Sequence, residues 1–147
     1  MNPLAAAVVI AVLVLGAAAV GLVLRSRSGR RRRVKVSAIA ASDVGLSVLG
    51  DLATVVQFST EYCSRCPGVR RALHGELADR DGVTYTDVDL THRPELASRL
   101  RVLQTPTILV VDSTGHVVSR HAGVVSIASI RTDLDALRKD GHVQLVS

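Results

Sequence analysis

Hydrophobic and polar residues follow two different periods along the chain from about residue 43 onward. Short continuous or alternating apolar runs predict strands, and apolar residues repeated every three or four positions predict one-sided helices. The expected strands are Thr54–Phe58, Val83–Val88, Thr107–Val111 and His116–Ala122. The expected helices begin near Cys63, at Pro94 and near Ser126, the last ending at Lys139 before Gly141. The residues before Thr54 are mildly apolar and favour a short strand or a turn-rich entry.

This order, β-α-β-α-β-β-α, predicts an α/β fold with a mixed sheet of about four strands. The two inner β-α-β steps indicate a parallel segment, and the final hairpin indicates an antiparallel edge. Because helices precede and follow the strands, we expect helices on both faces of the sheet.

The N-terminal pattern is different, since Leu4 to Leu24 is apolar on every side and carries no charge. A helix of this length spans about 31 Å, close to the thickness of the hydrocarbon core of a bilayer. We therefore expect a transmembrane helix in residues 1–24, a linker in residues 25–42 and a globular domain in residues 43–147. A cleaved signal peptide is the alternative, but the run is longer than usual and Met1-Asn2-Pro3 has no basic residue.

The linker is strongly basic between Arg25 and Lys35, with no acidic residue among its arginines. The formal net charge of the chain is +5, and without this cluster acidic residues outnumber basic ones. Basic flanks face the cytoplasm, so we expect a single-pass protein of the cell membrane whose domain is cytoplasmic, with Arg25–Lys35 near anionic lipid. A nucleic-acid patch would need further basic or aromatic surface, which the domain does not offer.

Cys63 and Cys66 are the only cysteines, and two residues separate them after an apolar strand. A Cys-x-x-Cys pair in this context is typical of a redox site. The positive end of the helix and Arg65 would lower the pKa of the Cys63 thiol, so Cys63 is expected to attack a substrate disulfide and Cys66 to resolve it. A structural disulfide is an alternative, but so short a ring restrains little chain entropy.

A zinc site is a further alternative, but it would need a second pair of ligands. The histidines show no ligand spacing and are expected at the surface, so the sequence predicts no metal. Thr105-Pro106-Thr107 opens an apolar strand, where a proline marks a strand entry or a cis turn.

From Asp51 to Lys139 the chain resembles the thioredoxin family, on Phe58, Cys63-Ser64-Arg65-Cys66, Val88-Asp89, Thr105-Pro106-Thr107 and the Gly115 hairpin. The resemblance implies a thioredoxin-like fold, with Pro106 in the cis form beside the cysteines. It also implies that substrates contact Tyr62, Arg65, Thr105 and Pro106. The implied activity is thiol–disulfide exchange without a bound cofactor.

The chain departs from the family pattern beneath the cysteines. Gln57 stands where the family holds a buried aspartate, and Tyr85 stands at the position of its lysine partner. Since glutamine takes up no proton near neutral pH, water or Glu61 would accept the proton, or turnover would be slow. Pro67, directly after Cys66, would loosen the first helical turn.

We expect a monomeric enzyme that reduces protein or small-molecule disulfides near the membrane, receives electrons from a reductase and binds no nucleic acid. Arg65 would favour the reduced form and so a more oxidising potential, whereas a cytoplasmic location favours a reductase. The alternatives are a redox-inert interaction module, or a disulfide oxidase or isomerase outside the cytoplasm.

Overall fold

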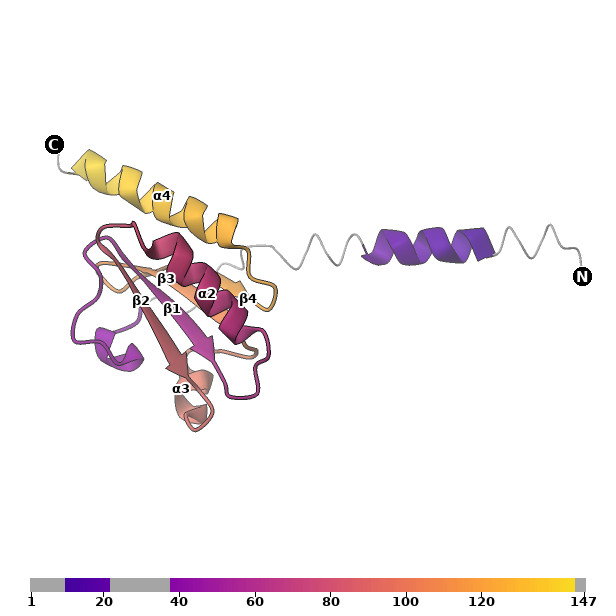
Figure 1. Ribbon diagram of the computed structural model, residues 1–147, viewed down its shortest axis with the longest axis horizontal. Helices are drawn as coiled ribbons and strands as arrows, with labels where there is room; N and C mark the ends of the chain where they lie inside the picture. The colour runs from indigo at the N-terminus through magenta and orange to yellow at the C-terminus, as the bar shows by residue number, and fades with distance from the viewer. Residues whose placement is uncertain (1–9, 22–37, 145–147) are drawn as a thin grey trace, which may run out of the picture. The chain divides into compact units, whose positions relative to one another are not determined.

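The computed structural model describes residues 10–21 and 38–144, with side chains described as far as Lys139. These residues belong to two separate units (Figure 1), of which the first contains a helix at residues 10–21. No helix in the described parts of the chain combines the length and apolar composition needed to cross a membrane. The rest of the expected span, and the basic run from Arg25 to Lys35, lie outside the described residues.

The second unit is built on a four-stranded sheet, so the predicted mixed sheet flanked by helices is confirmed. Its strands are β1 (Ala53–Ser59), β2 (Val83–Asp89), β3 (Thr107–Asp112) and β4 (Val117–Ala122). They lie in the order β2-β1-β3-β4, with β1 parallel to β2 and antiparallel to β3, and with β3 antiparallel to β4.

The prediction that both inner β-α-β steps are parallel was wrong for the second step, because β3 runs against β1. The helix between them, α3 (Pro94–Arg99), has 6 residues and spans only about 9 Å along its axis. β2 has 7 residues and spans about 23 Å, so this helix cannot return the chain to the start of β2. The chain therefore enters β3 at the end of the sheet where β2 finished.

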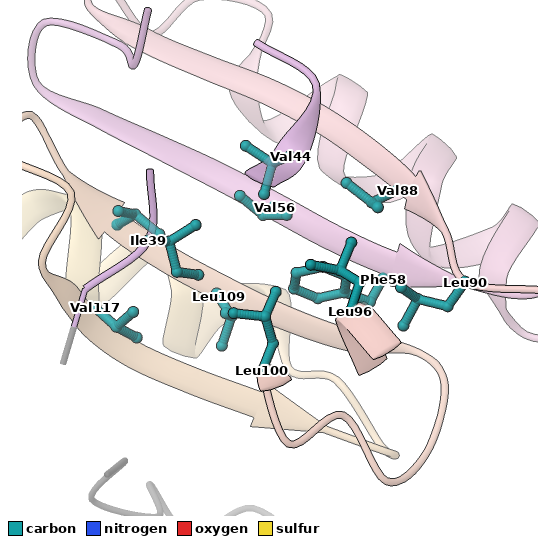
Figure 2. Close-up of a cluster of buried hydrophobic side chains, with 11 residues drawn as sticks. Ile39, Val44, Val56, Phe58, Val88, Leu90, Leu96, Leu100, Leu109 and Val117 are labelled. Carbon is teal, nitrogen blue, oxygen red and sulfur yellow. The ribbon is translucent and has the colours of Figure 1, made fainter. Parts of the chain in front are cut away.

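Two hydrophobic clusters cover the two faces of the sheet, because side chains alternate along each buried strand. In β1, Val56 and Phe58 belong to one cluster and Val55 belongs to the other. The first cluster includes Leu96 and Leu100 at α3 and Val44 of the 3-10 helix η1 (Ala41–Val44), as Figure 2 shows. All residues of β1 are buried, which explains its continuous apolar pattern.

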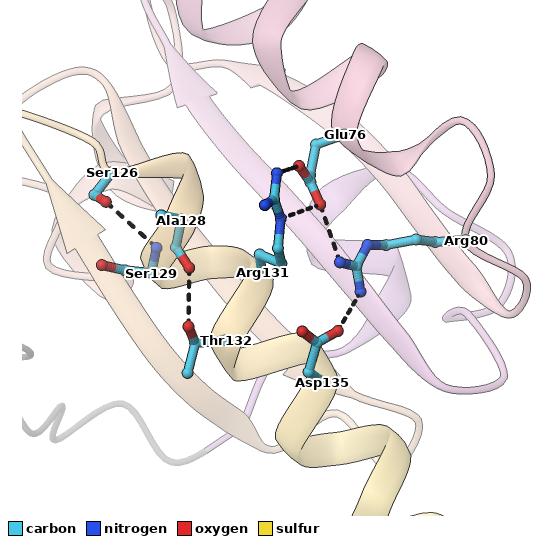
Figure 3. Close-up of polar contacts among 8 residues, drawn as sticks. All are labelled: Glu76, Arg80, Ser126, Ala128, Ser129, Arg131, Thr132 and Asp135. Carbon is cyan, nitrogen blue, oxygen red and sulfur yellow. Dashed lines mark hydrogen bonds and ion pairs between the residues drawn. The ribbon is translucent and has the colours of Figure 1, made fainter.

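The second cluster packs α2 (Cys66–Leu77) and α4 (Ile127–Gln144) against the opposite face. Figure 1 shows both helices on the same side of the sheet, where Leu73, Ile130 and Leu134 are fully buried. α4 begins after Ser126, whose Oγ accepts the Ser129 N–H at 3.3 Å (Figure 3).

Charged side chains also join α2 to α4, at the surface above that cluster (Figure 3). Arg131 donates to both carboxylate oxygens of Glu76, and Arg80 donates to Glu76 at 3.0 Å and to Asp135 at 2.8 Å. The Arg131 contact is the main reason why the pKa of Glu76 falls from 4.5 to about 2. These four residues fix the helix that carries Cys66 to the C-terminal helix.

The entry to the domain is turn-rich rather than a full strand. Ala38 forms one antiparallel bridge with His116, and Ile39 is buried and donates its N–H to the Gly115 carbonyl at 2.8 Å. At the other end, α4 continues through Gly141 to Gln144, so the expected stop at Gly141 was wrong. Glycine lowers helix propensity by about 1 kcal/mol, which does not by itself end a helix.

One histidine also differs from the prediction that all are exposed. His121 on β4 is 9% exposed, and its Nε2 lies 2.9 Å from the carboxylate of Asp133, which is 1% exposed. The Ser119 hydroxyl lies 3.2 Å from the same nitrogen. Strand alternation and the partner on α4 bury this side chain, and the sequence carried no signal of that pairing.

Candidate active site

The end of the sheet where β1 and β2 finish is also the end where β3 begins. Ser59 pairs with Asp89 at this end, and Phe58 pairs with Thr107. The loop after β1 carries Cys63 and leads into Cys66, the first residue of α2, and the loop before β3 carries Pro106. The two loops meet where the hydroxyl oxygens of Thr60 and Thr105 lie 3.3 Å apart.

Cys63 and Cys66 form a disulfide whose Cα atoms are 5.5 Å apart. Cys63 is partly exposed, whereas Cys66 is 2% exposed. This asymmetry agrees with the sequence-based assignment of attack to Cys63 and resolution to Cys66, which stays a prediction. Cys63 is thus the more open of the two cysteines.

The helix does not begin at Cys63 as expected, but three residues later at Cys66. Cys63 lies in the preceding turn, where its N–H is bonded to the Thr60 carbonyl at 3.1 Å. Pro67 follows as the second helical residue, where a backbone N–H would have no partner within the helix. The expected loosening by Pro67 therefore has no structural basis, since proline suits this position.

Two of the expected substrate-contacting residues, Tyr62 and Arg65, are exposed on either side of Cys63. Tyr62 is 86% exposed, and its hydrogen bond with Glu61 is the main cause that raises the pKa of its hydroxyl. Both residues are placed where an incoming disulfide could touch them, and their roles stay predictions.

The peptide bond between Thr105 and Pro106 is cis, as the resemblance implied, and Pro106 is buried. The Gly123 N–H donates to the Pro106 carbonyl at 2.9 Å, and the Thr107 hydroxyl donates to the Gln104 carbonyl at 2.7 Å. These contacts hold the Thr105–Pro106 segment between β3 and the end of β4.

Arg120, which the sequence pattern did not single out, supports the loop before β3 from β4. Its guanidinium donates to the carbonyls of Leu100, at 3.1 and 3.2 Å, and of Arg101, at 2.8 Å. Burial lowers the pKa of Arg120, and the negative end of α3 supplies the compensating partners. Within the alternating pattern of β4, Arg120 looked like an ordinary surface residue.

Two polar residues, Gln57 and Tyr85, lie beneath Cys66. They stand at the two positions where the chain departs from the family pattern of a buried aspartate and its lysine partner. Gln57 is fully buried; its Nε2 donates to the Cys66 carbonyl at 3.2 Å and its Oε1 accepts the Tyr85 hydroxyl at 3.0 Å. Burial is the main cause that raises the pKa of Tyr85 to about 12, and the nearby Asp87 carboxylate adds to it. The departures at positions 57 and 85 thus meet in space.

An open hollow of about 480 Å³ lies beside the disulfide, between α2 and β2. Residues that line it include Cys63, Cys66, Arg70, His74, Tyr85 and Asp87. Arg70 forms an ion pair with Asp87, which also accepts the Ser59 hydroxyl at 2.6 Å. Water therefore has access to the side of the cysteine pair that faces β2.

Metal-binding side chains do not cluster in the parts of the chain that the structure describes. No group of three or more His, Cys, Asp or Glu residues there could hold a metal ion.

Solved thioredoxins share this arrangement of sheet and helices. Chloroplastic thioredoxin z matches with a TM-score of 0.56 at 21% identity, over 74% of this chain and 98% of its own. Thioredoxin 1 of the thermophilic eubacterium Thermosipho africanus TCF52B gives 0.54 at 17%, over 60% and 98%. Thioredoxin f2 of Chlamydomonas reinhardtii gives 0.50 at 23%, over 56% and 77%. At these identities the similarity establishes the fold alone.

A comparison with curated proteins gives no match. The thioredoxin family model, however, matches residues 45–136, which is more than half of the chain and includes the disulfide and the cis proline. On the strength of that match, together with the fold, the chain belongs to the thioredoxin family.

Proposed function

We propose that the protein is a thiol–disulfide oxidoreductase that reduces disulfides of proteins close to a membrane. The observation that carries the proposal is the Cys63–Cys66 pair, with one partly exposed sulfur and one sheltered sulfur at disulfide distance. Membership of the thioredoxin family supports the general activity.

The reaction uses the two sulfurs in sequence. In the reduced protein, the Cys63 thiolate attacks a substrate disulfide, forms a mixed disulfide and releases one substrate thiolate. The Cys66 thiolate then attacks the sulfur of Cys63, which releases the second substrate thiolate and closes the ring. Two electrons pass to the substrate, and an electron-donating reductase must return two electrons to the protein.

The membrane location is a proposal from the sequence. The uncharged run from Leu4 to Leu24 and the basic residues from Arg25 to Lys35 support attachment to a membrane with the domain in the cytoplasm. Treatment of intact cells with a membrane-impermeant alkylating reagent should leave Cys63 unlabelled. Rapid labelling of Cys63 would instead favour a domain outside the cytoplasm, where the oxidising environment favours oxidase or isomerase activity over reduction.

Reduction of insulin disulfides by the purified protein, with dithiothreitol as electron donor, tests the activity. Cys63→Ser should be inactive, whereas Cys66→Ser should accumulate a mixed disulfide with its substrate. Ser64→Ala, inside the same ring, is the matched control and should keep the activity. A wild-type protein that does not turn over would favour the redox-inert binding module, which the uncharged Gln57 beneath Cys66 supports as a second candidate.

A further inference from the structure

The amide of Gln57 connects the strand β2 to the backbone of Cys66. The Tyr85 hydroxyl donates to its oxygen at 3.0 Å, and its nitrogen donates to the Cys66 carbonyl at 3.2 Å. Two hydrogen bonds thus run from an edge strand, through the central strand, to the first residue of α2. The carbonyl that they hold belongs to the residue that closes the disulfide.

The Cys66 carbonyl decides which way the amide points. A carbonyl oxygen can only accept, so it requires the NH2 group of Gln57, whereas a tyrosine hydroxyl can either donate or accept. With Nε2 directed at the Cys66 carbonyl, Oε1 is directed at Tyr85 and accepts its O–H. If the hydroxyl were removed, Oε1 would lose this partner, and of the two bonds only that to the Cys66 carbonyl would remain.

Gln57 and Tyr85 also keep the same protonation state over the pH range in which a thiol titrates. Gln57 carries no titratable proton, and burial raises the pKa of Tyr85 to about 12, well above the range of an ordinary thiol near 8.5. The two hydrogen bonds of the Gln57 amide, one to Cys66 and one to Tyr85, are therefore present from acidic to moderately alkaline pH.

Several charged or titratable groups face Cys66 and Tyr85 across the hollow. They are Arg70 and His74 on α2, Asp87 and Asp89 on β2, and Glu61 in the loop after β1. Asp87 is ion-paired with Arg70, Asp89 accepts both the N–H and the hydroxyl of Thr91, and Glu61 is exposed. The hollow itself opens to solvent beside Cys66, which gives the thiol proton a route to water.

We propose that Gln57 and Tyr85 are positioning residues for the resolving step, and that the Cys66 proton leaves to water in the hollow without a buried acid. Cys66 loses its proton to water, and its thiolate forms the bond to the sulfur of Cys63. The bond between Cys63 and the substrate breaks, and the substrate sulfur leaves with the electron pair and takes a proton from solvent. The inference rests on the proposed function.

The test separates the two steps in the full-length protein by acid quench and mass analysis, with an oxidised model peptide as substrate. Tyr85→Phe keeps the ring that packs 4.7 Å from His74 and removes only the hydroxyl. We expect formation of the mixed disulfide at the wild-type rate and its decay about fivefold slower, the size of one neutral hydrogen bond. A purely structural role would reduce stability without changing the ratio of the two rates.

The pH dependence of the decay provides the second readout. The wild-type rate should show one titration, that of Cys66, and Gln57→Glu should add a second titration from the new buried carboxyl. Glu61→Gln is the control for the exposed carboxylate on the same hollow and should match the wild type.

Three results would overturn the inference: an unchanged decay rate in Tyr85→Phe, a second titration in the wild type, or slower decay in Glu61→Gln. A wild-type protein that forms no mixed disulfide at all would overturn the proposed function, and the inference with it. Formation of the mixed disulfide by the wild type therefore distinguishes a failure of the inference from a failure of the proposed function.

Discussion

Replacement of Glu76 by glutamine tests the ionic contact that joins α2 to α4. The Glu76 side chain is 11% exposed and accepts hydrogen bonds from Arg131 and Arg80 (Figure 3). These contacts, with that of Arg131 the largest, lower its pKa from 4.5 to about 2. Glu76→Gln keeps the shape of the side chain and removes its charge.

The lowered pKa sets an upper limit on the contribution of this charge to stability. A fall from 4.5 to about 2 corresponds to about 3 kcal/mol of unfolding free energy at pH 7. Arg131 is 56% exposed and Asp135 is 50% exposed, so solvent and salt screen part of the interaction. We therefore expect Glu76→Gln to lower the free energy of unfolding by about 1–2 kcal/mol.

The sign of the pH effect follows from the direction of the pKa. A carboxyl whose folded-state pKa is lowered stabilises the protein fully above its unfolded value of 4.5, and this stabilisation is lost as the pH falls toward 2. Urea unfolding of the full-length chain at pH 7, 4 and 2.5 should show the difference between wild type and variant shrinking at each step.

A matched control is Glu95→Gln, since Glu95 is exposed and has no ion pair among the residues that the structure describes. Its substitution should change stability by no more than about 0.5 kcal/mol at any pH. A difference between wild type and Glu76→Gln that stays constant from pH 7 to pH 2.5 would refute the electrostatic reasoning and point to packing instead.

Three further substitutions test other parts of the structure. Asp133→Ala should lower the free energy of unfolding by about 3 kcal/mol in thermal unfolding, because it removes the carboxylate beside buried His121; an unchanged melting temperature would contradict this. Gly115→Ala should cost about 2 kcal/mol in urea unfolding, since its φ is +89° and a Cβ would lie 2.6 Å from the Ile39 carbonyl oxygen. Arg120→Met should raise KM for insulin several-fold with kcat unchanged, because it frees the loop before Pro106. Arg120→Lys should restore part of the affinity, and a fall in kcat as large as the rise in KM would argue against a role in binding.

Much of the sheet was predictable because buried strands require apolar residues, which appear in the sequence as continuous or alternating runs. The apolar run Thr54–Phe58 became a strand buried on both faces, and the alternating run from Val83 became a half-buried edge strand. The cysteine spacing and Pro106 likewise pointed to one site, since both flank predicted strands. These features depend on local residue types, which a single sequence displays.

Other features depend on partners that are distant in the sequence. The direction of β3 follows from the short path through α3, and the burial of His121 follows from Asp133 on another element. The start of α2 at Cys66 rather than Cys63 reflects the turn that brings the two sulfurs together. Periodicity alone cannot locate such contacts, because it describes one element at a time.

Gln57 shows how a local departure and a distant partner combine. A long polar side chain within a fully buried strand costs free energy unless its amide is bonded, so a buried glutamine in an apolar run is itself a signal. Both bonds observed for the amide lead to the site: one reaches Cys66, and the other reaches Tyr85, the second position at which the chain departs from the family pattern. An aliphatic residue would fill the same space without a desolvation penalty. The contact with the Cys66 backbone therefore explains why a polar residue stands here, and it connects the sequence departure to the resolving step that we propose.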